Sequence, residues 1–346
     1  MLTTFCWLNL NPMRLELTRL AALVVLSASI GVCPSAQAVS CTTNSQMTPT
    51  DRDHYVQTVH ALGTRIQAAD AAAVRQQTIA PVAAVFDPLA ASIQAVAPQI
   101  QAATLTVNAL YSLKASDLKA TQDETQFFCS VPGSGLVISV TIPQLPPGDY
   151  LLALLHATGV EHSQQLSLLL QNDPPGSPEW KLAGLFVRPL TAAGHDGVWY
   201  WTAARNYAQK KQDWNSYFYY QTAAFLLNPV DFLSSPNLEK LQKEAQAVRP
   251  PELPGPEPLV LKAGGQSFNI TSLRTESFPG GLDLVINYRT TDVSDPVATH
   301  SQIVELMKAM LTEYPELRQA FHGLWVYANA DKQSPYAIEL PMNKIP

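Results

Sequence analysis

The segment RPPELPGPEP at residues 249–258 constrains the fold most, because five of the nine residues from Pro250 onward are proline. Proline fixes φ and has no backbone N–H, so this segment suits neither a helix interior nor a central strand. Proline-rich spacers are semi-rigid and extend by about 3.1 Å per residue. We therefore expect a Pro-rich linker here, with a separate small domain at residues 259–346.

The N-terminus has the three parts of an export signal, counted from Met13. Two arginines precede an apolar run from Leu20 to Val32, and Ala-Gln-Ala at 36–38 supplies a small-x-small cleavage pattern. This pattern predicts a signal peptide over residues 1–38 and a periplasmic or secreted mature protein. A membrane span needs about 20 apolar residues. No run of that length is present, so we expect no transmembrane anchor.

Cleavage of the leader leaves two cysteines, Cys41 and Cys129. An even pair in an oxidising compartment favours one disulfide, which would tie the N-terminal arm to the first domain. The alternative is a lipid anchor at Cys41, because Ala38-Val39-Ser40-Cys41 is a degenerate lipobox. The apolar run ends too early for a good lipobox, which favours the disulfide.

The mature chain keeps 20 basic and 27 acidic residues, a net charge of −7. An acidic chain repels the phosphates of nucleic acid unless a basic patch intervenes, and Lys210-Lys211 is the one basic pair. We therefore expect no nucleic-acid partner.

Residues 51–190 are predicted to form an α+β domain. Residues 39–50 before it are polar and expected to be irregular, and Thr50 with Asp53 resembles a capping box at the first helix. Apolar residues recur from Tyr55 at helical spacing, and alanine-rich helical segments broken by prolines, Pro98 the last, continue to about residue 97.

Alternating apolar residues predict strands at 137–142, 150–157, 165–170 and 180–187. Helices that cover one face of an antiparallel sheet make an α+β layout. This order over residues 51–188 resembles the nuclear-transport-factor-like superfamily, which implies a curved, cone-shaped sheet. Members of that superfamily include enzymes, ligand binders and interaction modules, so the resemblance does not select a function.

Residues 195–248 are predicted to be helical, beginning at GHDGVWYW (194–201). The adjacent His195 and Asp196 are also a ligand pair in metal-dependent phosphohydrolases, which need further His and Asp ligands from neighbouring helices. Asp196 fits an N-cap that accepts hydrogen bonds from the first helical amides, and glycines on both sides ease the turn. We interpret the pair as a helix start.

Tyr200-x-x-Ala203-Ala204-x-x-Tyr207 has the spacing of the first helix of a tetratricopeptide repeat. Ser216, Tyr220 and Ala223 match its second helix, so residues 195–248 resemble a lone tetratricopeptide-like hairpin. The order of parts along the whole chain also resembles an uncharacterised group of secreted bacterial proteins. This resemblance implies export from the cytoplasm and implies no activity.

Aromatic residues are concentrated in this hairpin, where ten of the 29 fall within residues 199–225. The repeat register places some between the helices and leaves a second set outside: Trp199, Trp214, Tyr217 and Tyr219. These four either pack on flanking domains or contact a partner. We expect most of them to be core and Trp214, beside the inter-helix turn, to be exposed.

The small domain at 259–346 is predicted to contain a hairpin at Gly280-Gly281 and a helix beginning at Asp295-Pro296. Two strands, LWVYANA and YAIEL, follow the helix. The helix keeps one apolar face: Ile303, Leu306, Met307, Met310, Leu311 and Tyr314.

Motifs for catalysis or cofactor binding are missing from the sequence, which has no GxSxG, GxGxxG, phosphate loop, CxxC or HExxH. We therefore predict no catalytic, cofactor or metal site. The prediction is a non-catalytic exported envelope protein that acts through protein–protein contacts with another envelope protein. The alternative is a small-molecule binding protein that uses the concave sheet of the first domain, with Tyr150, His156 and Trp180 as the residues to inspect.

Overall fold

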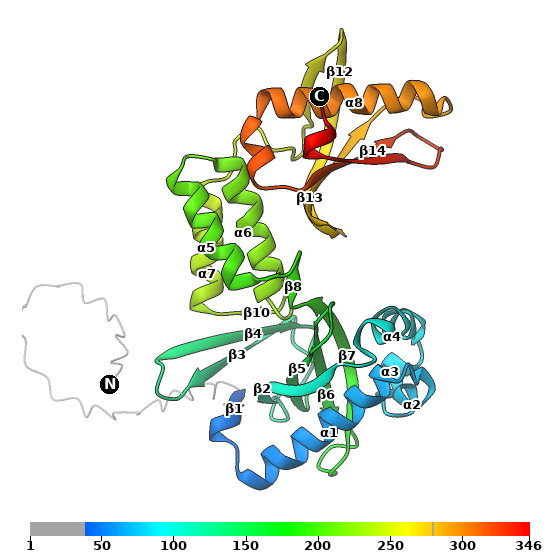
Figure 1. Ribbon diagram of the computed structural model, residues 1–346. Coiled ribbons are helices and arrows are strands. Elements are labelled where there is room, and N and C mark those ends of the chain that lie inside the picture. Colours follow the sequence, from blue (N-terminus) through cyan, green and yellow to red (C-terminus); the bar gives the residue numbers. More distant parts are fainter. Residues whose placement is uncertain (1–38, 279) are drawn as a thin grey trace, which may run out of the picture. The chain divides into compact units, whose positions relative to one another are not determined.

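A computed structural model describes residues 39–278 and 280–346 (Figure 1). The fold is α+β, with helices and mostly antiparallel sheets, as the sequence predicts. The predicted signal peptide at 1–38 lies outside the described residues. Within them, no helix combines the length and the apolar character that crossing a bilayer requires.

Four helices open the first domain: α1 (Pro49–Gln67), α2 (Ala71–Gln76), α3 (Ala80–Ala83) and α4 (Asp87–Ile100). The cap of α1 is Thr48, whose hydroxyl accepts from the Asp51 amide at 3.2 Å, and not the predicted Thr50. The start moves because Pro49 suits the first helical position, where no N–H is needed. Pro98 lies in the last turn of α4 and does not end it.

A five-stranded antiparallel sheet follows in the order β1-β2-β5-β6-β7. Its strands are β1 (Ser40–Thr43), β2 (Thr104–Lys114), β5 (Asp149–Thr158), β6 (Gln164–Asn172) and β7 (Trp180–Pro189). The arm expected to be irregular therefore contains an edge strand. Pairing with β2 satisfies its backbone groups, with Cys41 opposite Leu113.

A second sheet covers the face of the first sheet for which the sequence predicts no covering element. It has the order β10-β4-β3, from β3 (Glu124–Val131), β4 (Leu136–Pro143) and β10 (Leu233–Ser234). Along β5, Leu151 and Leu155 pack in the core shared with the helices, and Leu152 and Leu154 pack in the core shared with the second sheet. Burial on both faces explains why this strand is a continuous apolar run and not an alternating one.

Three helices form the next segment: α5 (Gly197–Gln209), α6 (Asp213–Leu227) and α7 (Pro236–Ala247). The short strands β8 (Thr191–Ala192) and β9 (His195–Asp196) precede them. Ser216 of α6 donates to the Ala204 carbonyl of α5 at 2.9 Å, so the two helices cross closely at small residues. Lys211 occupies the left-handed turn between them with φ 58°.

Glu244 of α7 binds both helices of the hairpin. Its Oε2 accepts from Trp201 Nε1 at 2.7 Å, Arg205 Nε at 2.7 Å and Tyr220 OH at 3.2 Å, and its Oε1 accepts from Arg205 Nη2 at 2.8 Å. The hydrogen bonds from Arg205, more than any other contact, lower the pKa of Glu244 below its ordinary value.

Glu244→Gln is expected to lower the free energy of unfolding at pH 7 by about 1–2 kcal/mol, because charge-assisted hydrogen bonds to a half-exposed arginine are lost. The folded state depresses the pKa of Glu244, so the carboxylate stabilises the fold above its unfolded pKa near 4.5. That stability is lost as the pH falls through the folded value.

Urea titrations at several pH values should therefore show the gap between wild type and variant closing below about pH 4.5. The exposed Glu239 of α7 provides the control, and Glu239→Gln should change stability by less than about 0.5 kcal/mol. A stability difference between wild type and Glu244→Gln that stays constant down to pH 3 would contradict a stabilising role of the Glu244 carboxylate.

The C-terminal sheet has the order β11-β12-β13-β14-β15. Its strands are β11 (Leu259–Ala263), β12 (Gln266–Phe278), β13 (Gly281–Arg289), β14 (Gly323–Asn329) and β15 (Tyr336–Pro341). Only β13 and β14 run parallel among these pairs, joined through α8 (Pro296–Glu313) and the 3-10 turn η2 (Pro315–Gln319). A last turn, η3 (Met342–Lys344), closes the chain.

The predicted α8 is confirmed. Asp295 caps it by accepting from the amides of Val297 and Ala298, and all six residues of its predicted apolar face are buried. This face covers one side of the sheet, which leaves Asp283, Trp325 and Glu339 on the other side. The same core also contains Tyr200, Trp214 and Phe218 of the hairpin, so it continues across the Pro-rich segment.

Candidate functional site

Trp214, the predicted exposed residue of the hairpin, is buried with 3% of its surface accessible. Its ring packs on Tyr314 with 4.1 Å between centroids, and its Nε1 donates to Glu252 Oε1 at 3.2 Å. The prediction was wrong because Tyr314 and Glu252, both distant in sequence, cover the end of the hairpin. Trp214 cannot serve as a partner contact.

Tyr219 and Tyr217 agree with the core interpretation. Tyr219 is buried and donates from its hydroxyl to the Ala320 carbonyl at 2.6 Å, and burial raises the pKa of this phenol. Tyr217 is half-buried and packs edge-on against Phe218 with 5.6 Å between centroids.

Trp199 is the member of the predicted set that remains exposed, with 42% of its surface accessible. The predicted cap is confirmed, since Asp196 Oδ1 accepts from the Trp199 amide at 2.7 Å. The His195 ring stacks on the indole at 3.6 Å and 6°, and Tyr200 meets it edge-on at 5.0 Å. Val198 beside it is 58% exposed, so an exposed aliphatic side chain adjoins an indole ring that is held in place.

The residues suggested for a ligand site in the first domain do not converge. Tyr150 is buried and donates to the Pro146 carbonyl at 2.9 Å, His156 contacts Gln165, and Trp180 packs edge-on against Tyr55. The second sheet covers the face of the first sheet that was expected to be concave and open. A cavity of about 560 Å³ lies beside strands of both sheets, and Tyr150, His156 and Trp180 do not line it. Its lining residues are Thr43, Asn44, Ser45, Arg52, Ala109, Tyr111, Val131 and Ile138.

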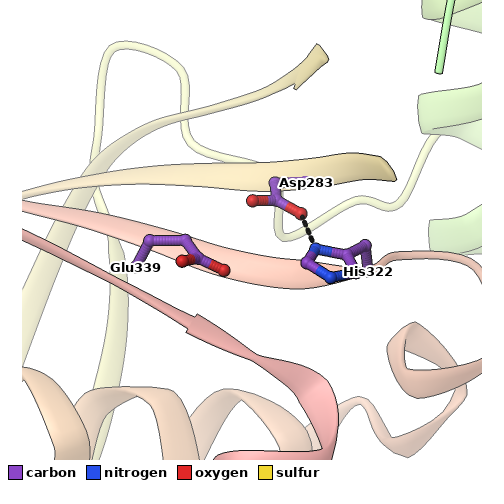
Figure 2. A group of neighbouring side chains, drawn as sticks. All are labelled: Asp283, His322 and Glu339. Carbon is purple, nitrogen blue, oxygen red and sulfur yellow. Dashed lines mark hydrogen bonds and ion pairs between the residues drawn. The ribbon is translucent and has the colours of Figure 1, made fainter. Parts of the chain in front are cut away.

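A cluster that sequence reasoning missed lies on the C-terminal sheet (Figure 2). Asp283 comes from β13, Glu339 from β15, and His322 from the residue just before β14. One nitrogen or oxygen of each lies within 4.8 Å of those of the other two. His322 Nδ1 and Asp283 Oδ1 are hydrogen-bonded at 3.1 Å.

The backbone of His322 is fixed from both neighbouring strands. Its N–H donates to the Leu282 carbonyl and its carbonyl accepts from the Met342 amide, each at 2.8 Å. His322 therefore continues the line of β14 between β13 and the end of β15. Its side chain is held against Asp283, with 35% of its surface accessible.

Asp283 is the buried member of the cluster, and burial raises the pKa of its carboxyl although the hydrogen bond from His322 opposes this shift. Phe278 of β12 and Trp325 of β14 stack at 4.2 Å between centroids. Phe278 pairs with Gly281 and Trp325 with Val285, so the stacked rings cross β13 at about the level of Asp283.

The cluster has no short-range signature. Asp283 and His322 are 39 residues apart, and Glu339 follows on another strand, so only the strand order brings them together. The one local hint is a glycine close to each of the first two positions: Gly281 lies two residues before Asp283, and Gly323 directly follows His322.

In comparisons with known proteins, no protein-family model, no curated protein and no solved structure matches the chain.

Proposed function

We propose that this chain is an exported, non-catalytic protein that acts by binding another envelope protein, with Trp199 at the centre of the contact. The export pattern at residues 1–38 and the disulfide between Cys41 and Cys129 support a periplasmic or secreted location, because disulfides persist in oxidising compartments. The observation that carries the proposed contact is the exposed and pre-positioned indole of Trp199.

The surroundings of Trp199 fit a binding hot spot. Tryptophan is enriched among residues that dominate interface energies, and a ring fixed before binding loses little entropy on association. His195 covers one face of the indole, so a partner meets the remaining face and the adjacent Val198. The partner expected from this chemistry is a protein that presents an apolar segment. It is not a nucleic acid.

In-cell photo-crosslinking tests the proposal. A benzophenone amino acid at Val198 in the exported protein is expected to give one discrete adduct, which mass spectrometry identifies. The adduct should disappear in a Trp199→Ala background, while the melting temperature of the purified protein changes little. The same probe at Val297, which is 77% exposed in the first turn of α8, is the matched control and should give no such adduct.

Two results would count against this contact: an adduct that persists after Trp199→Ala, or the same adduct from Val297. Either one would show that exposure alone, and not the Trp199 surface, selects the crosslinked protein.

A further inference from the structure

We propose that Asp283, His322 and Glu339 form a binding site for a divalent transition-metal ion, with Zn²⁺ as its representative (Figure 2). The site goes beyond the proposed protein contact and does not depend on it. It also departs from the expectation of no metal site, which rested on short-range sequence motifs.

Gly323 leaves the space in which the two carboxylates converge. Leu284 pairs with Leu324 in the parallel ladder, so Asp283 aligns with Gly323. A Cβ at Gly323 would lie 2.9 Å from Glu339 Oε1 and 3.2 Å from Asp283 Oδ1. Any side chain here would fill the volume between the oxygens, and only glycine keeps it free.

Two carboxylate oxygens of the cluster have no hydrogen-bond partner among the described residues: Asp283 Oδ2 and Glu339 Oε1. The Asp283 side chain is 99% buried, with 1% of its surface accessible. A carboxylate removed from water without a partner is costly, and a cation is the partner that would satisfy both oxygens together. This second observation separates the cluster from a simple His–Asp hydrogen bond, which would leave Glu339 unexplained.

The donor set favours a transition metal over Mg²⁺ or Ca²⁺. One imidazole nitrogen and two carboxylates suit Zn²⁺ and its neighbours, whereas Mg²⁺ and Ca²⁺ take oxygen ligands. A Cβ at Gly280 would lie 3.0 Å from His322 Nε2, so that nitrogen packs on the hairpin turn and Nδ1 faces Asp283. Nδ1 is therefore the ligand nitrogen.

The distances require little movement. Metal bonds of about 2.0–2.2 Å in a tetrahedral site place ligand atoms about 3.3 Å apart. His322 Nδ1 and Asp283 Oδ1 already lie 3.1 Å apart, and one ligand atom of each of the three residues lies within 4.8 Å of the other two. A small rotation of the half-buried Glu339 closes the remaining gap, and the accessible edge of His322 gives the ion a route from solvent. The fourth coordination position is left for water.

Titration of the full exported chain with Zn²⁺, after treatment with a chelator, tests the site by calorimetry. We expect one Zn²⁺ per chain, with affinity reduced about tenfold or more in Glu339→Gln and in His322→Ala. Far-UV circular dichroism checks that each variant folds, and Glu339→Gln keeps the test decisive because this side chain is only half-buried. His300→Ala and Glu305→Gln on α8 are the controls and should bind as wild type does.

Co²⁺ supplies a spectroscopic readout, because it replaces Zn²⁺ and is expected to quench Trp325, which pairs with Glu339 across β14 and β15. Absence of stoichiometric Zn²⁺ binding would overturn the proposal. Binding unchanged in both ligand variants would overturn it too, and Mg²⁺ binding as tight as Zn²⁺ would overturn the assignment to a transition metal.

Discussion

Trp214→Ala is expected to lower the free energy of unfolding by about 3–5 kcal/mol, the cost of removing a large buried aromatic side chain. The substitution would open a cavity beside Tyr314. It would also remove the indole N–H that donates a hydrogen bond to Glu252. Both effects act in a core that joins the hairpin to the C-terminal sheet. Urea unfolding followed by far-UV circular dichroism measures the change.

Trp199→Ala is the matched control, since it removes the same side chain from the same hairpin at an exposed position. Its stability cost should stay near or below about 1 kcal/mol, mainly from loss of the stack on His195. Equal costs for the two variants would mean that burial does not distinguish these tryptophans.

Replacing both Cys41 and Cys129 by alanine is expected to cost about 2–4 kcal/mol, because the crosslink restricts the unfolded chain over a long loop. The two residues are 88 positions apart and join the edge strand β1 to β3 of the second sheet. The single variant Cys41→Ala should cost nearly as much, because it loses the same crosslink. Thermal unfolding with and without reductant measures the effect.

Non-reducing peptide mapping of the exported protein checks the same bond chemically and should join the peptides of Cys41 and Cys129. An acylated Cys41 would contradict this prediction and would favour the lipid anchor instead. Full stability of the alanine variants would show that the strand pairing of β1 suffices without the covalent link.

Local patterns predicted the parts of the fold that depend on neighbours in sequence. Asp196 caps α5 and Asp295 caps α8, because a cap needs only a carboxylate and the next few amides. The buried face of α8 follows from a period of 3.6 residues in the same way.

Features that depend on distant residues were not predictable from such patterns. Trp214 lies beside a turn, which suggests exposure, but Tyr314 reaches it from 100 residues further along the chain. The second sheet over β5 was not predicted, because the sequence pattern of a strand does not specify which sheet the strand joins. Asp283 and His322 meet only through the parallel pairing of β13 and β14, and no spacing rule encodes that register.

The shared core of the hairpin and the C-terminal sheet has a practical consequence for anyone who divides this chain into fragments. The run of prolines at 249–258 looks like the natural place to cut, but a fragment beginning at residue 259 would expose Phe321 to water, where Phe218 and Tyr219 now pack against it. Such a fragment should aggregate and be poorly soluble. A boundary near residue 190, ahead of β8, keeps the hairpin with the C-terminal sheet, but it separates β10 from β4 and uncovers Leu233 and Leu238. Neither cut leaves every core intact, so expression of residues 39–346 as one piece is the better choice.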